Sequence, residues 1–353
     1  MFKRIIHLVP QNGIGGVEAS AATLPNASCD NFSYSVEYIS NLATYNINIF
    51  RQITFFYKAI VRVIKLNPDI LICSLWKSAF IGCILKLIKP NIVLVCFLHN
   101  SRSQHFFDYF FNKILMSLST QIWADSLATM NARVDKKMFI KTKIISFLIR
   151  NNSAYSIKLK PEPNFIFWGR LHYQKNIKFA MGIFCEIRKK YPKATFSIIG
   201  PDAGQLSALK FEAERLNLNA NVKFLGALSY EEICKNSIKN SFYLQTSLYE
   251  GMAMSVIEAM QLGLVPVVTP VGEIGFYCKD GINSLIINEL HDAVSKIMQV
   301  ITDSNEYEKI RYSAFETWKD TPRYKDDILI ACQSLIDKKW HLNTKKNHEN
   351  SPI

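Results

Sequence analysis

The sequence lacks the short motifs that mark several common kinds of site. Its 353 residues include eight cysteines, and no two have the C-x-x-C spacing typical of zinc and thioredoxin-like redox sites. No D-x-D occurs, so the carboxylate pair that often binds a divalent metal is missing. G-x-G-x-x-G and the P-loop motif are absent as well. We therefore expect free, mostly buried thiols and no metal.

Long apolar runs are also missing. The most apolar region, 70–98, is interrupted by Lys77, Lys86, Lys89 and Pro90, whereas a membrane-spanning helix needs roughly 18 or more apolar residues in a row. We interpret this region as strand, helix and strand. The opening stretch MFKRIIHLVPQNG holds too short an apolar run for a signal peptide. These features predict a cytoplasmic protein.

Acidic residues are scarce in the first part of the chain. Residues 1–150 hold 17 Lys and Arg against 7 Asp and Glu, a balance of +10, whereas residues 151–353 hold 25 against 22. Such an excess favours an anionic partner: nucleic acid, a phosphorylated substrate or a membrane surface. The alternative is the solvated surface of an ordinary basic protein.

Short β-like runs alternate with longer helical stretches along the chain. Many of these runs are apolar on both faces, which is typical of parallel strands covered by helices on both sides. The pattern predicts an α/β fold with parallel sheets. The predicted strands are 4–9, 70–75, 92–98, 122–125, 144–148, 165–169, 194–200, 222–226, 241–246 and 265–269.

The alternating pattern starts a second time after a polar stretch that contains prolines. We predict a Rossmann-like domain over 1–150, a linker over 151–163 and a second Rossmann-like domain over 164–305. Residues 306–338 are expected to form C-terminal helices that pack back on the first domain. Residues 339–353 are expected to form a polar, frayed tail.

Two motifs in the first domain follow predicted strands. NGIGGVEAS places Gly13, Gly15 and Gly16 after the first strand, where glycines let the backbone approach a ligand at a helix N-terminus. The alternative is a tight strand-to-helix turn. In VCFLHNSR, His99 and Asn100 follow an apolar strand. Ligands in such folds bind beyond the carboxyl ends of strands, so His99 is a candidate site residue. The alternative is a structural histidine.

The stretch FIFWGRLHYQKN, residues 165–176, places two cations after an apolar strand and a glycine. Arg170 and Lys175 lie on the loop that leads into the next helix. A guanidinium fork, an ammonium group and the N–H groups of a helix N-terminus together suit a diphosphate. The alternative is ordinary surface charge.

The stretch EGMAMSVIEAM places two carboxylates eight residues apart. Glu250 falls on a loop, and a helix is expected to start near Ser255. Ser255-x-x-Glu258 also fits a capping box, in which Glu258 bonds back to the helix start. Glu258 is therefore either such a cap or, with Glu250, part of one site near the helix N-terminus.

In combination these motifs resemble those of the family 4 retaining glycosyltransferases. The resemblance covers most of the chain and is best over 165–290, where E-x7-E is followed by GLVPVVTP and VGEIG. It implies the GT-B fold, in which two Rossmann-like domains face each other across a cleft. Met252 and Ala253 replace the Phe-Gly or Phe-Pro that is common in the family, and Glu273 replaces a glycine.

The resemblance also implies a role for each matched residue. Two residues would be catalytic at the transferred sugar, Glu250 and His99, and three would surround that sugar, Gly251, Met252 and Ala253. The diphosphate of the donor would be held by Gly15, Gly16, Arg170 and Lys175. Its ribose would be held by Glu258.

The implied reaction moves a hexose or similar sugar from a UDP-, GDP- or dTDP-linked donor to a hydroxyl, with retention and without metal or cofactor. The expected acceptor is a growing, lipid-linked bacterial cell-surface glycan, as in lipopolysaccharide, O-antigen or capsular polysaccharide synthesis.

The stretch 103–118 is rich in aromatic residues. With the basic balance it favours peripheral contact with anionic lipid at the inner face of the plasma membrane. An ordinary buried helix is the alternative.

Two other classes of function stay open. One is a glycoside hydrolase that uses Glu250 and Glu258 as its carboxylate pair. The other is a non-catalytic basic protein that binds a membrane or nucleic acid. On the favoured interpretation no nucleic acid is bound.

Overall fold

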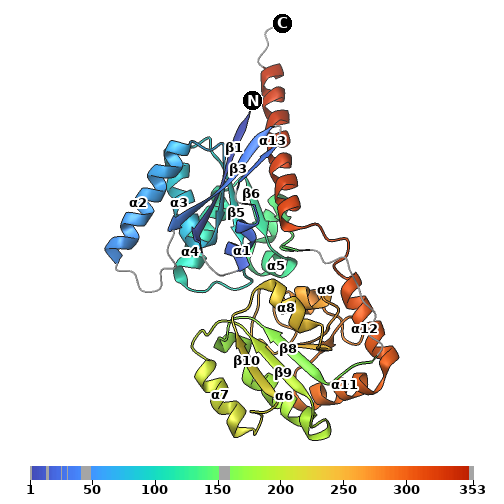
Figure 1. Cartoon of the computed structure of the whole chain (residues 1–353). Coiled ribbons are helices and arrows are strands. Elements are labelled where there is room, and N and C mark those ends of the chain that lie inside the picture. The colour runs from blue at the N-terminus through green and yellow to red at the C-terminus, as the bar shows by residue number, and fades with distance from the viewer. Residues whose placement is uncertain are drawn as a thin grey trace. The chain divides into compact units, whose positions relative to one another are not determined.

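Two separate parallel sheets organise the chain, which confirms the predicted α/β class (Figure 1). The structure is a computed structural model that describes residues 2–12, 16–24, 26–29, 31–40, 49–150 and 160–349. Met1–Ile149 and Pro322–Ile353 form unit 1, and Arg150–Thr321 form unit 2. Most of the predicted linker, 151–159, lies outside the described residues.

Unit 1 is built on a sheet whose described strands follow the order β2-β3-β1-β4-β5-β6-β7. Every pairing is parallel except that of β2 with β3. Strand order runs one way from β1 to β3 and the other way from β4 onward, so the sheet has a topological switch point between β1 and β4. Its strands are β1 (Lys3–Gln11), β2 (Asn26–Cys29), β3 (Phe32–Ser40), β4 (Ile70–Ser74), β5 (Val93–Leu98), β6 (Gln121–Ala124) and β7 (Thr142–Ile144).

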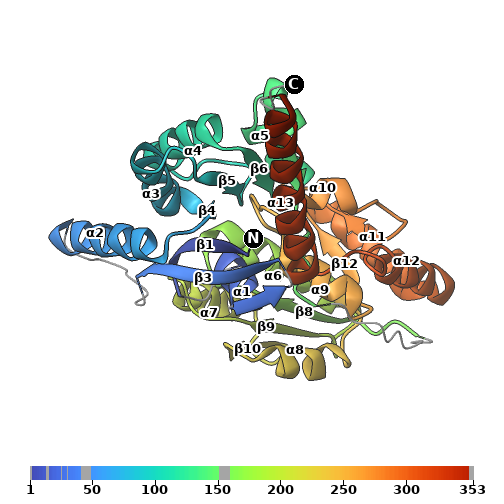
Figure 2. The same cartoon turned by 90° about the horizontal axis from the view of Figure 1, so that it is seen from above.

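Helices cover both faces of this sheet. Figures 1 and 2 show α2, α3 and α4 on one side and α13 on the other. The helices of unit 1 are α1 (Gly16–Ala22), α2 (Ile49–Leu66), α3 (Leu75–Ile88), α4 (Phe106–Leu118), α5 (Leu127–Arg133), the 3-10 helix η1 (Lys136–Lys141) and α13 (Tyr324–Glu349).

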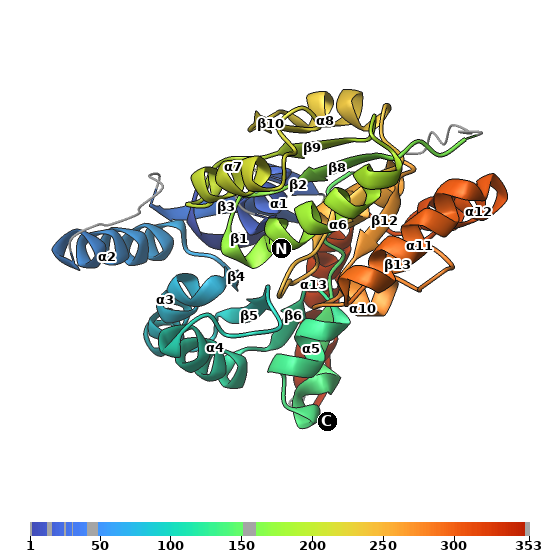
Figure 3. The ribbon, with the colours of Figure 1, turned by 90° about the horizontal axis from the view of Figure 1, so that it is seen from below.

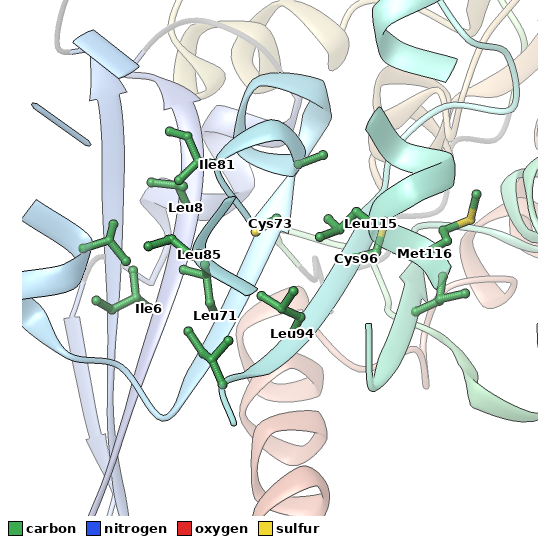
Figure 4. Packing of buried hydrophobic residues seen from close by; sticks show 14 of the residues in the cluster. Ile6, Leu8, Leu71, Cys73, Ile81, Leu85, Leu94, Cys96, Leu115 and Met116 are labelled. Atoms are coloured by element: carbon green, nitrogen blue, oxygen red, sulfur yellow. The ribbon is translucent and has the colours of Figure 1, made fainter. Parts of the chain in front are cut away.

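The strand residues of unit 1 alternate between two differently filled faces. One face forms an apolar core with α2, α3 and α4 (Figure 4). The strands and helices contribute, among others, Ile6, Leu8, Leu71, Cys73, Leu94, Cys96, Ile81, Leu85, Leu115 and Met116. Because successive side chains of a strand point to opposite faces, His7 and Ser74 belong to the other face, where α13 lies.

The chain returns to unit 1 at its C-terminal end. The backbone N–H of Tyr324, the first residue of α13, donates to the carbonyl of Leu148 at 2.7 Å, and the Ser146 N–H donates to the Asp327 carboxylate at 2.7 Å. The predicted strand 144–148 is wrong beyond Ile144, where β7 ends. The Ile145 N–H still donates to the Ala124 carbonyl of β6 at 2.9 Å, but the backbone at Ser146 and Leu148 bonds to α13. α13 extends to Glu349, past residue 338, where we expected the helical part to end.

Unit 2 holds a second sheet, whose described strands follow the order β10-β9-β8-β11-β12-β13 and are all parallel. Its strands are β8 (Asn164–Trp168), β9 (Thr195–Ile199), β10 (Val222–Gly226), β11 (Phe242–Gln245), β12 (Val265–Val268) and β13 (Leu285–Ile286). Its helices are the 3-10 helix η2 (Tyr173–Lys175), α6 (Ile177–Lys190), α7 (Leu206–Arg215), α8 (Tyr230–Ser237), α9 (Met254–Gln261), α10 (Ile274–Tyr277), α11 (Leu290–Thr302) and α12 (Ser304–Glu316).

In the second sheet, the order in which the chain adds its strands reverses between β8 and β11. Right-handed crossovers that run one way place α6 and α7 on one face, and those that run the other way place α8 and α9 on the opposite face. Figure 3 shows α6 and α8 on these two faces. The sequence prediction missed β2, β3 and β13 but found the central strands of both sheets.

No helix in the described ranges combines the length and the apolar character that crossing a bilayer requires.

Gly200 is the point of closest approach between two strand ends of unit 2. Its φ is +147°, and a Cβ built on it would lie 1.8 Å from the carbonyl oxygen of Gly169. We expect Gly200→Ala to lower the free energy of unfolding by more than about 1 kcal/mol, because Ala is strained there and the two backbones must separate. Urea denaturation measures the change.

The matched control is Gly182→Ala in α6, where a Cβ would meet nothing within 4 Å. Because Ala suits a helix interior better than Gly, this variant should gain about 0.5–1 kcal/mol. Equal effects of the two substitutions would contradict the close approach.

Candidate active site

The carboxyl ends of β8 and β11 lie side by side at the switch point of the second sheet. β8 continues into a loop that carries Arg170 and Lys175, and β11 continues into the loop 246–253, which carries Glu250. Hydrogen bonds join the two loops: the Gln174 amide donates to the Tyr249 carbonyl at 2.7 Å. Ligands of parallel sheets bind at such a position, so these loops form the candidate active site of unit 2.

Glu250 and Lys175 form an ion pair at the centre of this site. The Lys175 Nζ lies 2.6 Å from Oε1 of Glu250, and only 12% and 7% of the two side chains are exposed. The same oxygen accepts hydrogen bonds from the Ser247 hydroxyl at 2.6 Å and from the Gln245 amide at 3.2 Å. These partners hold the carboxylate in one orientation on a loop.

Gln245 links this carboxylate to the interior of unit 2. The side chain is fully buried, and its Oε1 accepts from the Tyr243 hydroxyl at 2.6 Å and from the Ser255 hydroxyl at 2.8 Å. Two donors on Oε1 leave the Nε2 end directed at Glu250, so the orientation of the amide follows from its partners. Burial raises the pKa of Tyr243 well above its usual value, which keeps this hydroxyl a donor.

Glu258 is held by different partners and is not a helix cap. Its Oε2 accepts from the indole N–H of Trp168 at 2.9 Å. Burial raises its pKa, and the Trp168 hydrogen bond and the charge of Arg150 oppose that rise. α9 begins at Met254 after Ala253, which has a φ of +56° and makes no side-chain cap bond. The capping-box alternative is therefore wrong, since the Ser255 hydroxyl donates to Gln245 instead.

The loop that carries Glu250 packs against the VGEIG segment, residues 271–275, and the residues that follow it. Gly272 has a φ of +60°, and a Cβ built there would lie 2.3 Å from the Glu250 carbonyl oxygen. The Glu273 N–H donates to the Gly251 carbonyl at 3.0 Å, and the Tyr277 hydroxyl donates to the Met252 carbonyl at 3.1 Å. The loop is thus held at its backbone as well as through the Glu250 carboxylate.

The two side chains that are predicted to bind the diphosphate differ in their contacts. Arg170 is exposed and makes no side-chain hydrogen bond or ion pair with any residue that the structure describes. Lys175 is already paired with Glu250, so an anion that binds its ammonium group must share it with that carboxylate. Both cations lie on the loop that follows β8, where the sequence predicts a diphosphate site.

The predicted site residues of unit 1 lie in their own sheet. His99 follows β5 and is buried, and its Nε2 lies 2.8 Å from the Ser74 hydroxyl. Gly16 is exposed at the start of α1, and Gly15 lies outside the described residues. Within the described ranges, no three His, Cys, Asp or Glu side chains gather closely enough to hold a metal ion.

Residues 150–317 match the protein-family model described as Glycosyl transferases group 1. This part of the chain is similar to a glycosyl transferases group 1 domain. That domain spans unit 2 almost completely, so the ion pair, Gln245 and Glu258 all belong to it. The roles that we predicted for individual side chains stay predictions.

Solved structures share the fold of the whole chain. HepE of Anabaena, solved with UDP-glucose, superposes with a TM-score of 0.76 and is 18% identical, over 95% of this chain and 100% of that one. Sucrose-phosphate synthase of Thermosynechococcus elongatus has a TM-score of 0.76 and 14% identity, over 96% and 100%. The predicted GT-B fold class, with two parallel-sheet α/β domains, is confirmed.

A curated relative is similar in sequence over part of its length. A human phosphatidylinositol N-acetylglucosaminyltransferase protein is 29% identical over 182 residues, which are 48% of this chain and 37% of that protein. The matched segment thus spans little more than a third of that relative.

Sequence reasoning missed the residues that orient the two carboxylates: Trp168, Gln174, Tyr243, Gln245, Ser247 and Ser255. A signal existed for Gln245 and Ser247, because both come at the carboxyl end of a strand that the sequence predicts. The signal was weak, because neutral side chains in the stretch SFYLQTS have no distinctive spacing.

Gln245→Leu should destabilise the protein, because the Ser255 hydroxyl loses its acceptor and the Glu250 carboxylate loses a donor. The Tyr243 hydroxyl keeps the Trp168 carbonyl, 3.1 Å away, as an acceptor. An unsatisfied buried group costs about 1–3 kcal/mol, so we expect a loss of that size in the free energy of unfolding. Chemical denaturation monitored by tryptophan fluorescence checks it.

Gln261→Leu is the matched control. Gln261 is also buried, but neither end of its amide has a partner among the described residues. Replacing it should leave stability unchanged or raise it. If both variants lose the same stability, the Gln245 bonds do not stabilise the site.

Proposed function

We propose that the chain is a retaining glycosyltransferase that uses a nucleotide-diphosphate sugar as donor. One observation carries the proposal: within the matched domain, Glu250 pairs with Lys175 across the two loops at the switch point of the sheet, and Arg170 lies on the same loop as Lys175. A departing diphosphate develops negative charge, and fixed cations that receive this charge accelerate such a reaction. The structural relative HepE was solved with UDP-glucose, which supports a nucleotide sugar as ligand.

The individual roles follow from this proposal. Arg170, Lys175, Gly15 and Gly16 bind the diphosphate. Glu258 binds the ribose. Glu250 acts at the transferred sugar, whose surroundings include Gly251, Met252 and Ala253, and His99 acts there as well. No metal or other cofactor takes part, and the absence of D-x-D from the sequence supports that part.

The proposed acceptor is a lipid-linked saccharide of a bacterial cell surface, as in lipopolysaccharide or O-antigen synthesis. The human relative is named for a phosphatidylinositol acceptor, which supports a lipid at the acceptor side. The hydrolase alternative has no comparable support, because the matched domain is a transferase domain.

We propose that α4 brings the enzyme to the inner face of the plasma membrane as a peripheral protein. The α4 aromatic face consists of Phe106, Phe107, Tyr109 and Phe110, which are 69%, 56%, 52% and 42% exposed. Exposed Arg102 and Lys113 flank it, and aromatic rings beside basic groups suit the interface of an anionic bilayer.

Glu250→Gln should abolish sugar transfer while the protein stays folded. A carboxylate that acts only in the transition state is expected to be worth on the order of 10²-fold or more in turnover. Release of the nucleotide diphosphate measures transfer, after a thermal-shift screen against UDP-, GDP- and dTDP-sugars has identified the donor. The anomeric configuration of the product, read by NMR, tests retention, and a chelator tests metal independence.

Glu186→Gln is the control, because Glu186 also pairs with a lysine, Lys189, at 2.7 Å, but on the exposed surface of α6. This variant should keep full activity. Full activity of Glu250→Gln, or no thermal shift with any nucleotide sugar, would falsify the proposed function.

Replacing both Phe106 and Phe110 by Ser should release the protein from vesicles that contain phosphatidylglycerol. Each buried aromatic side chain contributes about 1.5–3 kcal/mol, so the pair should reduce binding at least tenfold. Vesicle sedimentation measures the bound fraction. Phe211→Ser is the control, because Phe211 is also 69% exposed but lies on α7 of unit 2. Equal binding of all three proteins would exclude the α4 aromatic face as the membrane contact.

A further inference from the structure

Four polar side chains form a continuous hydrogen-bonded row inside unit 1. The Tyr34 hydroxyl lies 2.7 Å from Nδ1 of His7, and Nε2 of His7 lies 2.7 Å from the Ser74 hydroxyl. The Ser74 hydroxyl in turn lies 2.8 Å from Nε2 of His99. All four residues are buried. We call them the Tyr34–His99 row.

The row crosses the switch point of the first sheet. Tyr34 comes from β3, His7 from β1, Ser74 from the end of β4, and His99 from the residue after β5. The flanking strand residues Ile6, Leu8 and Cys73 belong to the opposite, apolar face, so strand alternation turns these four polar residues to one side. The row therefore leads from the interior of the sheet to its carboxyl edge.

The row ends in an atom without a partner. Nδ1 of His99 is buried and has no hydrogen-bond partner in the part of the chain that the structure describes. Phe97 and Phe147 pack against the ring, with centroids 4.1 Å and 5.3 Å from its own. A buried ring nitrogen with no partner, at the end of an otherwise complete row, indicates a ligand atom that belongs there.

Both imidazoles are neutral at neutral pH. Burial lowers the pKa of His7 to about 3. Burial, followed by His7 and by the positive charge of Arg133, lowers the pKa of His99 well below its usual value. Each ring therefore carries one proton, on either Nδ1 or Nε2.

Proton counting couples the two rings through Ser74. Each of the three links needs one hydrogen, and the Ser74 hydroxyl has only one to donate. If Ser74 donates to His7, it must accept from His99, whose Nδ1 is then bare. If Ser74 donates to His99, then His99 carries its proton on Nδ1. The tautomer of His99 thus depends on that of His7.

One consideration favours the first arrangement. It leaves an acceptor without a partner, and buried N–H donors without partners are the rarer case in proteins.

We propose that His7 and Ser74 are positioning residues that hold His99 in the tautomer with its proton on Nε2, so that Nδ1 accepts a hydrogen bond from a substrate hydroxyl. The inference rests on the proposed function for the identity of that substrate, a sugar. The row itself does not depend on it. His99 touches the substrate, and His7 and Ser74 act through His99.

The experiment is a long-range ¹H–¹⁵N correlation spectrum of the full chain labelled with ¹⁵N-histidine, without ligand. The imidazole nitrogens of His99, assigned with His99→Gln, should show a protonated Nε2 and a bare Nδ1. Ser74→Ala should convert His99 to a mixture of tautomers. Ser74 makes no side-chain cap bond to α3, so this variant loses the row and not a helix cap.

Ser78→Ala is the matched control, because Ser78 is equally buried in α3 and its hydroxyl has no partner among the described residues. It should leave the His99 signals and the transfer rate unchanged. Ser74→Thr keeps the hydroxyl and should keep the tautomer. In the transfer assay, Ser74→Ala should lower kcat/KM about tenfold, which is the size expected for one well-placed hydrogen bond.

A wild-type His99 that carries its proton on Nδ1, or that shows a mixture, overturns the inference, as does an unchanged tautomer in Ser74→Ala. Should Ser74→Ala fail to fold, the wild-type spectrum and His7→Gln decide in its place. If His99 holds its proton on Nε2 but the protein binds no nucleotide sugar, the proposed function is contradicted and the inference about the tautomer stands. If the protein transfers sugar but His99 shows mixed tautomers, the proposed function stands and the inference is overturned.

Discussion

The contact between the Lys175 ammonium and the Glu250 carboxylate governs the arrangement of the second sheet's carboxyl edge. Two opposite charges that are largely removed from water lose hydration, and their attraction compensates for this only if the remaining lone pairs also find donors. Ser247 and Gln245 supply those donors. Gln245 can do so only with its oxygen turned inward, which in turn requires the hydroxyls of Tyr243 and Ser255. The ion pair thus explains why a fully buried amide and a buried phenol stand at the end of β11.

The two sheets stabilise the polar groups at their switch points in opposite ways. At the switch point of unit 2, charged groups meet and are stabilised by neutral donors. At the switch point of unit 1, the Tyr34–His99 row is neutral throughout, because complete burial keeps both imidazoles in their neutral form, with one proton each. A neutral row creates little long-range electric field. The direction of each hydrogen bond in it nevertheless fixes the direction of the next one. Unit 2 therefore supplies charge at its edge, and unit 1 supplies a directed acceptor at its own.

The sequence was informative about strands and charged groups, and much less about their partners. Apolar runs that end in Gly169 or His99 identified the carboxyl edges, because only parallel buried strands are apolar on both faces. Arg170, Lys175 and Glu250 were predictable as a group, since each follows such an edge. The bonds of Gln245 and Ser74 were not predictable. They depend on strand register, such as Leu8 beside Cys73 in the pairing of β1 with β4, and register is set by packing over the whole sheet. The capping box failed for a related reason, because the sequence does not show that Trp168 reaches Glu258.

An existing partner for Lys175 has a consequence for the proposed reaction. A lysine with no partner near a phosphate site would be free to move and would lose side-chain entropy when the donor binds. Here Glu250 already holds the ammonium group beside the strand end, so that entropy has been lost during folding. A bound diphosphate then needs to draw the ammonium group only partly from the carboxylate. Exposed Arg170 has no such partner among the described residues and must be ordered by the ligand itself. The two cations therefore contribute differently: Lys175 as a preorganised charge, and Arg170 as a group whose ordering reports that the donor has bound.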